Sequence, residues 1–503
     1  MKKLLLMVLP GFFVFNLYAN NIKLEFSIKT GAEKQGKISS KGRMFIIFNK
    51  ERPAEMFKGL QYPDLNLGNV FGVDISGWSK GTELHISSGF SGFPLSNISN
   101  IQPGKWYVHA VYVDENNLPF INESGNFYSE IKLIEIKNTT IKQTIRFILD
   151  NIITRKEIFP DKSYVKYVKI KSQLLSEFWK RPIYLNAQVI LPKDYDKEKN
   201  KKYPILFVIG GFGSRYYDNI LNDDDWSSPQ MPSMIIVLLD SRCPFGDSYQ
   251  TNSANNGPYG DATVYELIPY IEEEFSCIGK PYARFLTGTS TGGWASLALQ
   301  IFYPDFFNGV WSTCADPVDF RAMELVNIYE NRNVFINPFN VERPAMRSSN
   351  GEPRYTLRTS IRAENMLGYG NSYVHSGAQW GSWNAVFSPK DSTTGMPMAL
   401  FDAYNGDINK NVAEHWKKYD LRLYLANHWD TIGKKIQGKL HIWMGTNDSY
   451  FLNNAMELLS NFLDGTTNPK SDAIITFECG EGHACASGVQ LIDMMKQMVE
   501  RIK

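Results

Sequence analysis

Hydrophobic and polar residues alternate along the first part of the chain with the period of a β-strand. The clearest runs are residues 23–28, 42–48 and 106–113. Successive side chains of a strand point to opposite faces of a sheet, so this alternation predicts half-buried strands. Clusters of Gly, Pro and Asn, such as residues 102–105, separate the runs. About seven short strands of this kind predict a β-sandwich domain over residues 20–137.

The pattern changes after residues 138–161, a mixed and polar stretch that we interpret as a linker. Residues 205–209 and 234–239 are continuous apolar runs, which are typical of buried parallel strands. Residues 261–275 instead carry apolar side chains at helical spacing. Alternating strands and helices predict an α/β domain over residues 162–503, with a mostly parallel sheet that is covered on both faces.

The alternation breaks over residues 320–439, which are rich in Asn, Arg, Gly and aromatic residues, and it resumes at residues 440–444. A long insertion between strands of such a sheet often lies over the carboxyl edge, where α/β proteins place their sites. We expect a cap-like insertion that shapes substrate access. A surface elaboration remote from the site is the alternative.

The chain begins with the pattern of a secretory signal peptide. Lys2 and Lys3 precede an uncharged, mostly apolar run that ends at Ala19. No cysteine lies at this junction, and no later run approaches the roughly 20 apolar residues of a membrane span. We therefore expect residues 1–19 to be removed and the protein to be periplasmic or extracellular; a retained N-terminal anchor is the alternative.

The net charge of +1 gives no basic footprint, which argues against a nucleic-acid partner. Cys479 and Cys485 flank His483 closely enough for a local disulfide, and free thiols are the alternative. The sequence holds neither C-x-x-C nor H-E-x-x-H, so we expect no metal site and no cofactor.

The motif Gly288-Thr289-Ser290-Thr291-Gly292 carries the clearest chemistry. It follows an apolar run and precedes residues 294–299, which are helical in character. A G-x-S-x-G motif between strand and helix is the nucleophile elbow of α/β-hydrolases, and its glycines make room for a very sharp turn. The motif predicts Ser290 as a nucleophile.

A serine nucleophile needs a base, and in α/β-hydrolases the partners follow in the order Ser, Asp or Glu, His. Of the seven histidines, His483 occupies the terminal position, between a predicted strand at 474–478 and a predicted helix at 488–499. Asp448 comes shortly after the predicted strand 440–444 and is the candidate acid. Asp316 and Asp319 are its rivals.

The oxyanion that forms during acyl transfer also needs hydrogen-bond donors. One N–H comes from the residue after the nucleophile, here Thr291. The second comes from a loop after an earlier strand, and the glycine-rich residues 209–213 fit that loop. We select Phe212 as this donor.

Five segments together resemble the putative esterase family of α/β-hydrolases, which includes esterase D (S-formylglutathione hydrolase), feruloyl esterases, enterochelin esterases and mycolyltransferases. The segments are Tyr203-Pro204 leading into residues 210–213, Gly257-Pro258-Tyr259-Gly260-Asp261, the elbow, residues 445–448 and Gly482-His483. The resemblance covers about residues 165–503 apart from the insertion, and it implies an esterase with Ser290, Asp448 and His483 as its triad. The family loop usually carries histidine where this chain has Gly210. The first domain resembles the β-domain attached to exported bacterial esterases.

The sequence is compatible with three functions. The first is an exported serine esterase that acts on a small-molecule or carbohydrate-linked ester. The second is a serine peptidase of the prolyl-oligopeptidase type, although residues 20–137 have room for only two or three propeller blades where four to eight are typical. The third is an inactive binding protein on a hydrolase scaffold. The β-domain would bind carbohydrate or pack as an accessory.

Overall fold

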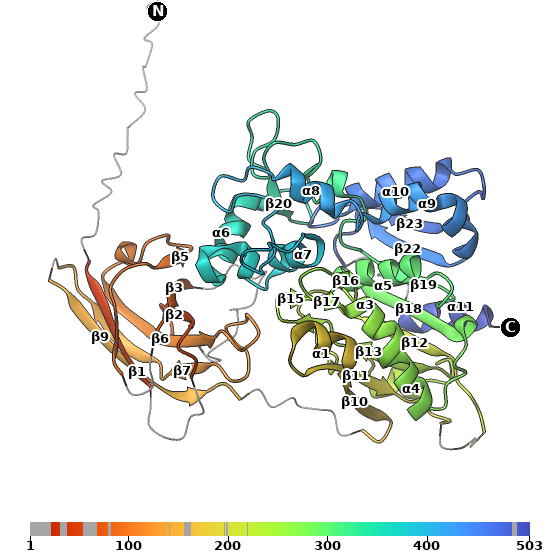
Figure 1. Cartoon of the computed structure of the whole chain (residues 1–503), viewed down its shortest axis with the longest axis horizontal. Coiled ribbons are helices and arrows are strands. Elements are labelled where there is room, and N and C mark those ends of the chain that lie inside the picture. The colour runs from red at the N-terminus through yellow and green to blue at the C-terminus, as the bar shows by residue number, and fades with distance from the viewer. Residues whose placement is uncertain are drawn as a thin grey trace, which may run out of the picture.

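The computed structural model describes residues 22–30, 38–53, 68–78, 82–139, 141–154, 162–195, 197, 200–218, 220–484 and 490–502. A β-domain lies at one end of the molecule and an α/β domain at the other (Figure 1). The predicted signal peptide, residues 1–19, lies outside the described residues. None of the helices in the described part of the chain has the length and apolar character of a membrane span.

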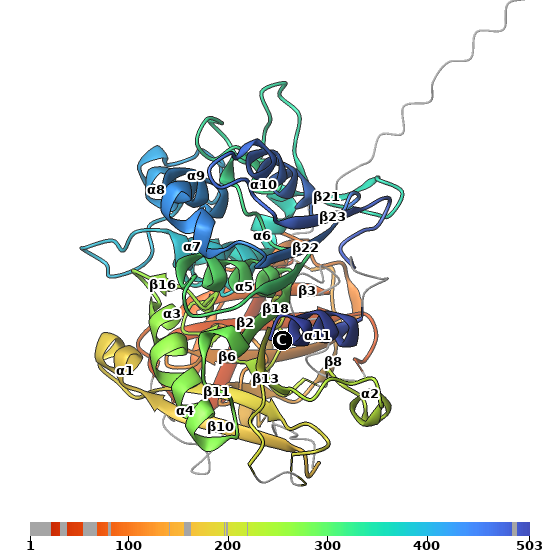
Figure 2. The same ribbon diagram turned by 90° about the vertical axis from the view of Figure 1, so that its right-hand side faces the viewer.

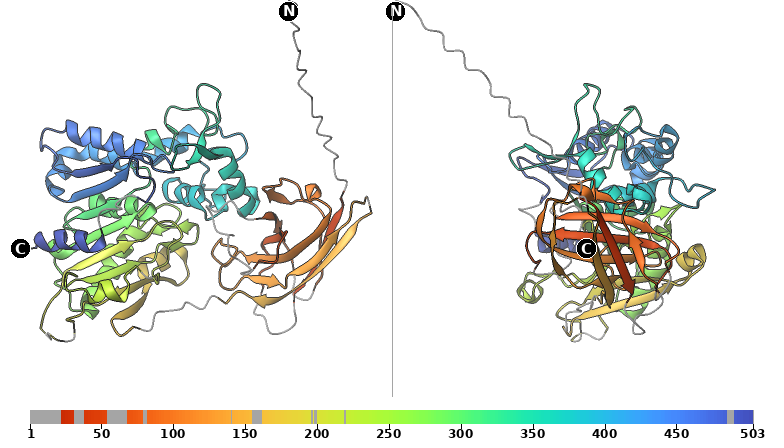
Figure 3. Two further views of the ribbon diagram at one scale, coloured as in Figure 1. Left: turned by 180° about the vertical axis from the view of Figure 1, so that it is seen from behind. Right: turned by 90° about the vertical axis from the view of Figure 1, so that its left-hand side faces the viewer.

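The β-domain is one continuous sheet that curls into two layers (Figure 3). Its elements are β1 (Leu24–Thr30), β2 (Gly42–Asn49), β3 (Asn69–Ile75), β4 (Leu84–Ile86), β5 (Ser91–Phe93), η1 (Ile98–Asn100), β6 (Gly104–Asp114), β7 (Phe127–Ser129), β8 (Lys132–Ile136) and β9 (Gln143–Ile152). The strand order is β4-β1-β9-β7-β6-β2-β3-β5, with β8 also paired to β6. Phe26 of β1 and Phe48 of β2 lie four positions apart in this order, yet their ring centroids are 6.5 Å apart. The sheet therefore folds over its own core. The predicted β-sandwich would consist of two separate sheets, whereas here backbone hydrogen bonds connect the two layers into one sheet.

The predicted linker is wrong over much of its length. Residues 143–152 form β9, which pairs in parallel with β1 and antiparallel with β7. Ile145, Phe147 and Leu149 alternate with exposed residues, so the isolated apolar positions of this stretch follow the strand period. The β-domain thus extends beyond residue 137 to Ile152.

The α/β domain is built on an eight-stranded sheet of order β10-β11-β13-β12-β18-β19-β22-β23. Its strands are β10 (Val165–Ser172), β11 (Ile183–Ile190), β12 (Ile205–Ile209), β13 (Ile235–Leu239), β18 (Arg284–Thr289), β19 (Val310–Thr313), β22 (Leu440–Gly445) and β23 (Ile474–Glu478). β10 and β11 are antiparallel to their neighbours, and the six strands from β13 to β23 are parallel. β12 and β23 have the bounds that the sequence predicts. Short strands outside the sheet are β14 (Arg242–Cys243), β15 (Gly246–Asp247), β16 (Asn252–Ser253) and β17 (Gly257–Pro258).

Helices cover both faces of this sheet. They are α1 (Gln173–Trp179), α2 (Asp223–Ser227), α3 (Tyr259–Ala262), η2 (Thr263–Leu267), α4 (Ile268–Glu274), η3 (Pro281–Ala283), α5 (Thr291–Phe302), α10 (Asn453–Gly465) and α11 (Leu491–Glu500). On β12, Ile205 and Phe207 pack in the core under α3 to α5, while Leu206 packs with Met495 of α11. Figure 2 shows α11 on the opposite side of the sheet from α3 and α4. Burial on both faces explains the continuous apolar runs.

The insertion connects β19 to its sheet neighbour β22. It contains η4 (Phe320–Ala322), β20 (Pro344–Arg347), β21 (Pro353–Thr356), α6 (Leu357–Leu367), η5 (Tyr369–Asn371), η6 (Tyr373–His375), α7 (Gln379–Phe387), α8 (Lys410–Trp416), α9 (Leu421–Ile432) and η7 (Gly433–Lys435). Ala363 and Met366 of α6 pack on Phe45 and Val70 of the β-domain. Arg43 of β2 is buried and donates hydrogen bonds to the Met366 carbonyl at 3.0 and 2.9 Å. The insertion thus attaches the β-domain to the α/β domain.

Candidate active site

Ser290 lies in the turn between β18 and α5, in the conformation of a nucleophile elbow. Its φ of 59° and ψ of −121° are outside the regions that most residues occupy. The flanking glycines are required by close approach. A Cβ on Gly288 would lie 2.2 Å from the Gly292 carbonyl oxygen, and one on Gly292 would lie 1.9 Å from the Ile209 carbonyl oxygen. This turn lifts the serine hydroxyl above the carboxyl edge of the sheet.

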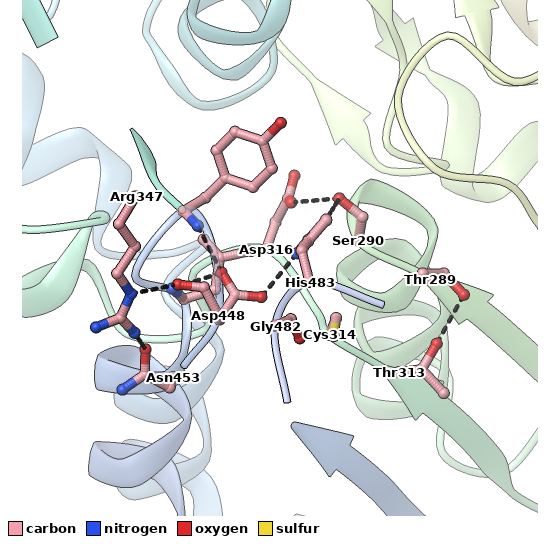
Figure 4. A network of polar contacts seen from close by, with 12 residues as sticks. Thr289, Ser290, Thr313, Cys314, Asp316, Arg347, Asp448, Asn453, Gly482 and His483 are labelled. Carbon is pink, nitrogen blue, oxygen red and sulfur yellow. Dashed lines mark hydrogen bonds and ion pairs between the residues drawn. The ribbon is translucent and has the colours of Figure 1, made fainter. Parts of the chain in front are cut away.

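Ser290, His483 and Asp448 form a continuous hydrogen-bonded chain (Figure 4). The Ser290 Oγ lies 3.0 Å from the His483 Nε2, and the His483 Nδ1 lies 2.7 Å from the Asp448 Oδ2. The three side chains come from the loops after β18, β22 and β23, which end at one edge of the sheet because these strands are parallel. The residues selected from the sequence are therefore in contact across almost 200 positions of the chain.

Asp448 is held rigidly behind the histidine. It is fully buried, and its Oδ1 accepts the backbone N–H groups of Tyr450 at 2.8 Å and Leu452 at 3.2 Å. Arg347, at the end of β20 in the insertion, donates from Nε to the Asp448 carbonyl oxygen at 2.9 Å and from Nη2 to Asn453 at 3.1 Å (Figure 4). The insertion thus holds the loop that carries Asp448. No sequence motif marks Arg347.

Asp316 is a second side chain within hydrogen-bond distance of the Ser290 hydroxyl (Figure 4). The Ser290 hydroxyl lies 3.2 Å from the Asp316 Oδ1. The Asp316 Oδ2 accepts hydrogen bonds from four other side chains, those of Tyr249, Thr291, Gln379 and Trp383, at 2.7, 3.0, 3.1 and 3.2 Å. A serine hydroxyl carries one proton, so it donates either to Asp316 or to His483 at any moment.

The other rival acid, Asp319, lies away from this chain of contacts. Its carboxylate pairs with Arg321 and Arg422, each at 2.7 Å. Because both arginines neutralise its charge away from Ser290, we assign Asp319 a structural role.

The charged groups around His483 raise the pKa of its imidazole. Burial lowers the pKa of His483, but its hydrogen bond to Asp448 and the charges of Asp448 and Asp316 outweigh burial, so the pKa lies above its ordinary value. Burial acts in the opposite sense on Asp316 and raises the pKa of that carboxyl, although its hydrogen-bond donors and His483 reduce the effect. A histidine with a raised pKa accepts a proton more readily from a hydroxyl.

A cavity of about 320 Å³ opens over Ser290 and His483. This volume is in the range of about 300–1,000 Å³ that is usual for small-ligand sites. The other residues that line the cavity come from the loop after β12, the end of β18, the loop after β19, the insertion and the loop after β22: Gly211, Phe212, Thr289, Asp316, Glu324, Gln379, Trp383, Tyr450 and Leu452. Three of these, Glu324, Gln379 and Trp383, belong to the insertion and carry no motif.

Of the two residues selected as oxyanion donors, Phe212 lines this cavity and Thr291 follows Ser290 directly in the chain. Phe212 lies in the loop after β12, and Thr291 is the first residue of α5, where backbone N–H groups have no partner within the helix. Gly211 lies so close to the elbow that a Cβ there would be 3.6 Å from the Ser290 Cβ. Phe212 also lines a smaller cavity of about 50 Å³ with residues 119–122 of the β-domain.

The sequence left two possibilities for Cys479 and Cys485, a local disulfide or free thiols, and the structure contradicts the disulfide. Cys479 is a free, exposed thiol, so the disulfide between Cys479 and Cys485 is wrong; Cys485 lies outside the described residues. Cys314 is the disulfide-bonded cysteine of the described chain, and its sulfur lies within 4.8 Å of ligand atoms of Asp448 and His483. A disulfide sulfur is a poor metal ligand, and the other two groups bond each other, so this set does not fit a metal ion.

The chain matches the family model described as "Putative esterase" over residues 183–466. The chain belongs to this family. It is an enzyme, an esterase that hydrolyses carboxylic esters. Among solved structures, the esterase is similar to a ferulic acid esterase at 15% identity and a TM-score of 0.40, over 68% of this chain and 99% of that one. It is also similar to an S-formylglutathione hydrolase from Agrobacterium tumefaciens at 11% identity and a TM-score of 0.40, over 68% of this chain and 98% of that one.

Proposed function

We propose that this protein is an exported serine esterase whose triad is Ser290, His483 and Asp448. The observation that carries the proposal is the hydrogen-bonded chain from the Ser290 Oγ through His483 to Asp448, with distances of 3.0 and 2.7 Å. Each atom has the partner that its role requires. The base faces the nucleophile, and the acid bonds the ring nitrogen that faces away from it.

The reaction follows from these contacts in two halves. The Ser290 Oγ attacks the ester carbonyl carbon while the His483 Nε2 takes its proton, and the backbone N–H groups of Phe212 and Thr291 donate to the oxyanion. His483 then gives the proton to the departing alcohol, which leaves an acyl group on Ser290. Water repeats the sequence: His483 takes its proton, the carboxylic acid departs, and Ser290 regains its hydrogen. Asp448 holds the Nδ1–H and stabilises the imidazolium in both halves.

The insertion is proposed to act as a cap that shapes substrate access. Glu324, Gln379 and Trp383 supply part of the cavity wall over Ser290. Trimming this wall by Trp383→Ala should change the ranking of bulky esters more than the turnover of small activated ones. Equal loss for every ester would assign Trp383 a folding role.

The peptidase alternative gains no support from the β-domain. The nine strands in its described residues form one hydrogen-bonded sheet, where a propeller consists of separate four-stranded blades. An inactive binding protein would have no need for a triad in which every hydrogen bond is formed. Export rests on the N-terminal sequence pattern alone, and fractionation of cells that express the full chain tests it.

Replacing the nucleophile tests the proposal. Ser290→Ala should lower the turnover of p-nitrophenyl acetate by several orders of magnitude, because the covalent route is lost. The melting temperature should stay close to that of the wild type. Asp319→Asn is a matched control, since this buried carboxylate lies outside the triad. Full turnover in Ser290→Ala would refute the assignment.

A further inference from the structure

Glu324 is a buried carboxyl that faces the active-site cavity without a hydrogen-bond partner of its own. Its side chain is part of the cavity wall beside Ser290, the residue is 6% exposed, and its Oε2 makes no hydrogen bond within the described structure. Buried polar groups are almost always hydrogen-bonded, because leaving one unpaired costs its full hydration. An exception inside an active site therefore indicates a partner that arrives with the substrate.

The contrast with Glu364 shows that this chain can satisfy a buried glutamate. Glu364 is fully buried, and its oxygens accept hydrogen bonds from the Ser376 hydroxyl at 2.8 Å and the Trp380 and Gly381 N–H groups at 2.9 and 3.0 Å. Glu324 has no comparable set of donors. Its nearest charged neighbours are themselves carboxyls, and burial together with Asp316, Glu364 and Asp448 raises its pKa well above the ordinary value.

The backbone at Glu324 is also held in an unfavourable conformation. Its φ is +54°, in the left-handed region that favours glycine and asparagine. Met323 and Val326 fix it there, because each N–H donates to the other residue's carbonyl, at 2.9 and 3.0 Å. Strained backbone that aims a side chain into a ligand site is a recurrent feature of functional positions.

We propose that Glu324 forms a substrate subsite that accepts a hydrogen bond from a hydroxyl or ammonium group of the ester. The inference rests on the proposed function, since the subsite lies in the cavity over the triad. The cavity supports this chemistry: Trp383, Tyr450 and Phe212 provide aromatic walls, and none of its lining residues is Lys or Arg. A hydroxyl bonds either protonation state of Glu324, whereas an ammonium group pairs with its carboxylate. Glu324 is thus a specificity-determining residue that leaves the chemistry to the triad.

Matched esters test the subsite on both sides of the ester bond. The acyl series is p-nitrophenyl propanoate, 3-hydroxypropanoate and 3-aminopropanoate, and the alcohol series is the acetates of propan-1-ol, propane-1,3-diol and 3-dimethylaminopropan-1-ol. In at least one series, the wild type should favour the hydroxyl or ammonium ester over the donor-free ester by about tenfold in kcat/KM. Glu324→Met should abolish this preference, so that donor and donor-free esters of one series reach similar kcat/KM values. Glu324→Gln should keep a preference for hydroxyl and lose one for ammonium.

Equal kcat/KM values across both series in the wild type, or a preference that survives in Glu324→Met, would overturn the subsite. Glu330→Met is the matched control, because Glu330 is exposed in the same segment, and it should keep the wild-type ranking. If Glu324→Met does not fold, Glu324→Asp, which withdraws the carboxyl by one methylene, should lose most of the preference. Turnover of the donor-free esters separates the two proposals: it persists if only the subsite is wrong and is absent if the triad is wrong.

Discussion

Replacing Asp448 by asparagine should disable ester hydrolysis while the fold stays intact. The Asp448 Oδ1 accepts the backbone N–H groups of Tyr450 and Leu452, at 2.8 and 3.2 Å. An asparagine must keep its oxygen at that position, which places its NH₂ group where Oδ2 lies, 2.7 Å from the His483 Nδ1. This NH₂ group only donates, so Nδ1 must become the acceptor and the ring proton must move to Nε2.

The size of the expected loss in kcat follows from this change of tautomer. With a proton on Nε2, His483 cannot accept the proton of Ser290 across their 3.0 Å contact. If the proton stayed on Nδ1 instead, this N–H and the asparagine NH₂ group would be two buried donors facing each other without an acceptor. We expect kcat to fall by roughly 10³–10⁴, which corresponds to about 4–5.5 kcal/mol in the activation barrier.

Asp316→Asn is the matched comparison, because Asp316 also lies beside Ser290 and is equally a buried carboxyl. Its Oδ2 accepts four side-chain donors, so an asparagine keeps its oxygen there and turns NH₂ toward the Ser290 Oγ, 3.2 Å away. This change removes an acceptor that competes with His483 and leaves the histidine tautomer intact. We expect kcat to stay within about tenfold of the wild type.

The assay is steady-state hydrolysis of p-nitrophenyl acetate at pH 8 by the wild type and both variants, with circular dichroism to verify folding. The variant at Asp448 should be the slower by at least about a hundredfold. If Asp316→Asn is the slower variant, Asp316 is the acid and the assignment of His483 Nδ1 to Asp448 is wrong.

Further predictions concern the base, the acid loop and the elbow. Because a base must be neutral and Asp448 raises the pKa of His483 despite burial, the pH profile of kcat/KM should rise with pH, with its lower midpoint above 6.5; a midpoint below 6.5 would contradict this. Arg347→Met should lower kcat about tenfold by loosening the Asp448 loop, whereas Arg354→Met, a change at an exposed position of the same hairpin, should leave steady-state turnover unchanged. Gly292→Ala should lower the free energy of unfolding in urea by at least about 3 kcal/mol, because its Cβ would lie 1.9 Å from a carbonyl oxygen, while Gly465→Ala, with no atom within 4 Å, should change it little.

The sequence predicts the α/β domain well because its strands are buried on both faces. A strand such as β12 is a continuous apolar run of five residues between turn residues, which is shorter than a typical buried helix. β9 was missed because its alternation of buried and exposed residues lies in a polar stretch after a turn. The curl of the β-domain was missed as well, because it depends on which strands pair, and that is decided by contacts such as Phe26 with Phe48.

Some residues of the candidate site could likewise be predicted from the sequence and others could not. Ser290, Asp448 and His483 could be selected because each follows a recognisable strand and the order of the three is fixed by the fold. Glu324 and Arg347 could not, because they lie in an insertion without periodicity, and their positions near the triad depend on contacts across about 100 residues or more, as between Arg347 and the Asp448 loop. For Cys479, closeness to Cys485 in the sequence suggested a disulfide, but Cys479 is a free thiol in the structure.

Mass spectrometry of the protein after treatment with a fluorophosphonate tests the central claim most directly, because the reagent bonds only a serine that a base has activated. We expect one adduct, on the peptide that contains Ser290, with labelling lost in Ser290→Ala and strongly slowed in Asp448→Asn. An adduct on another residue, or ester turnover that persists with Ser290 unlabelled, would contradict it.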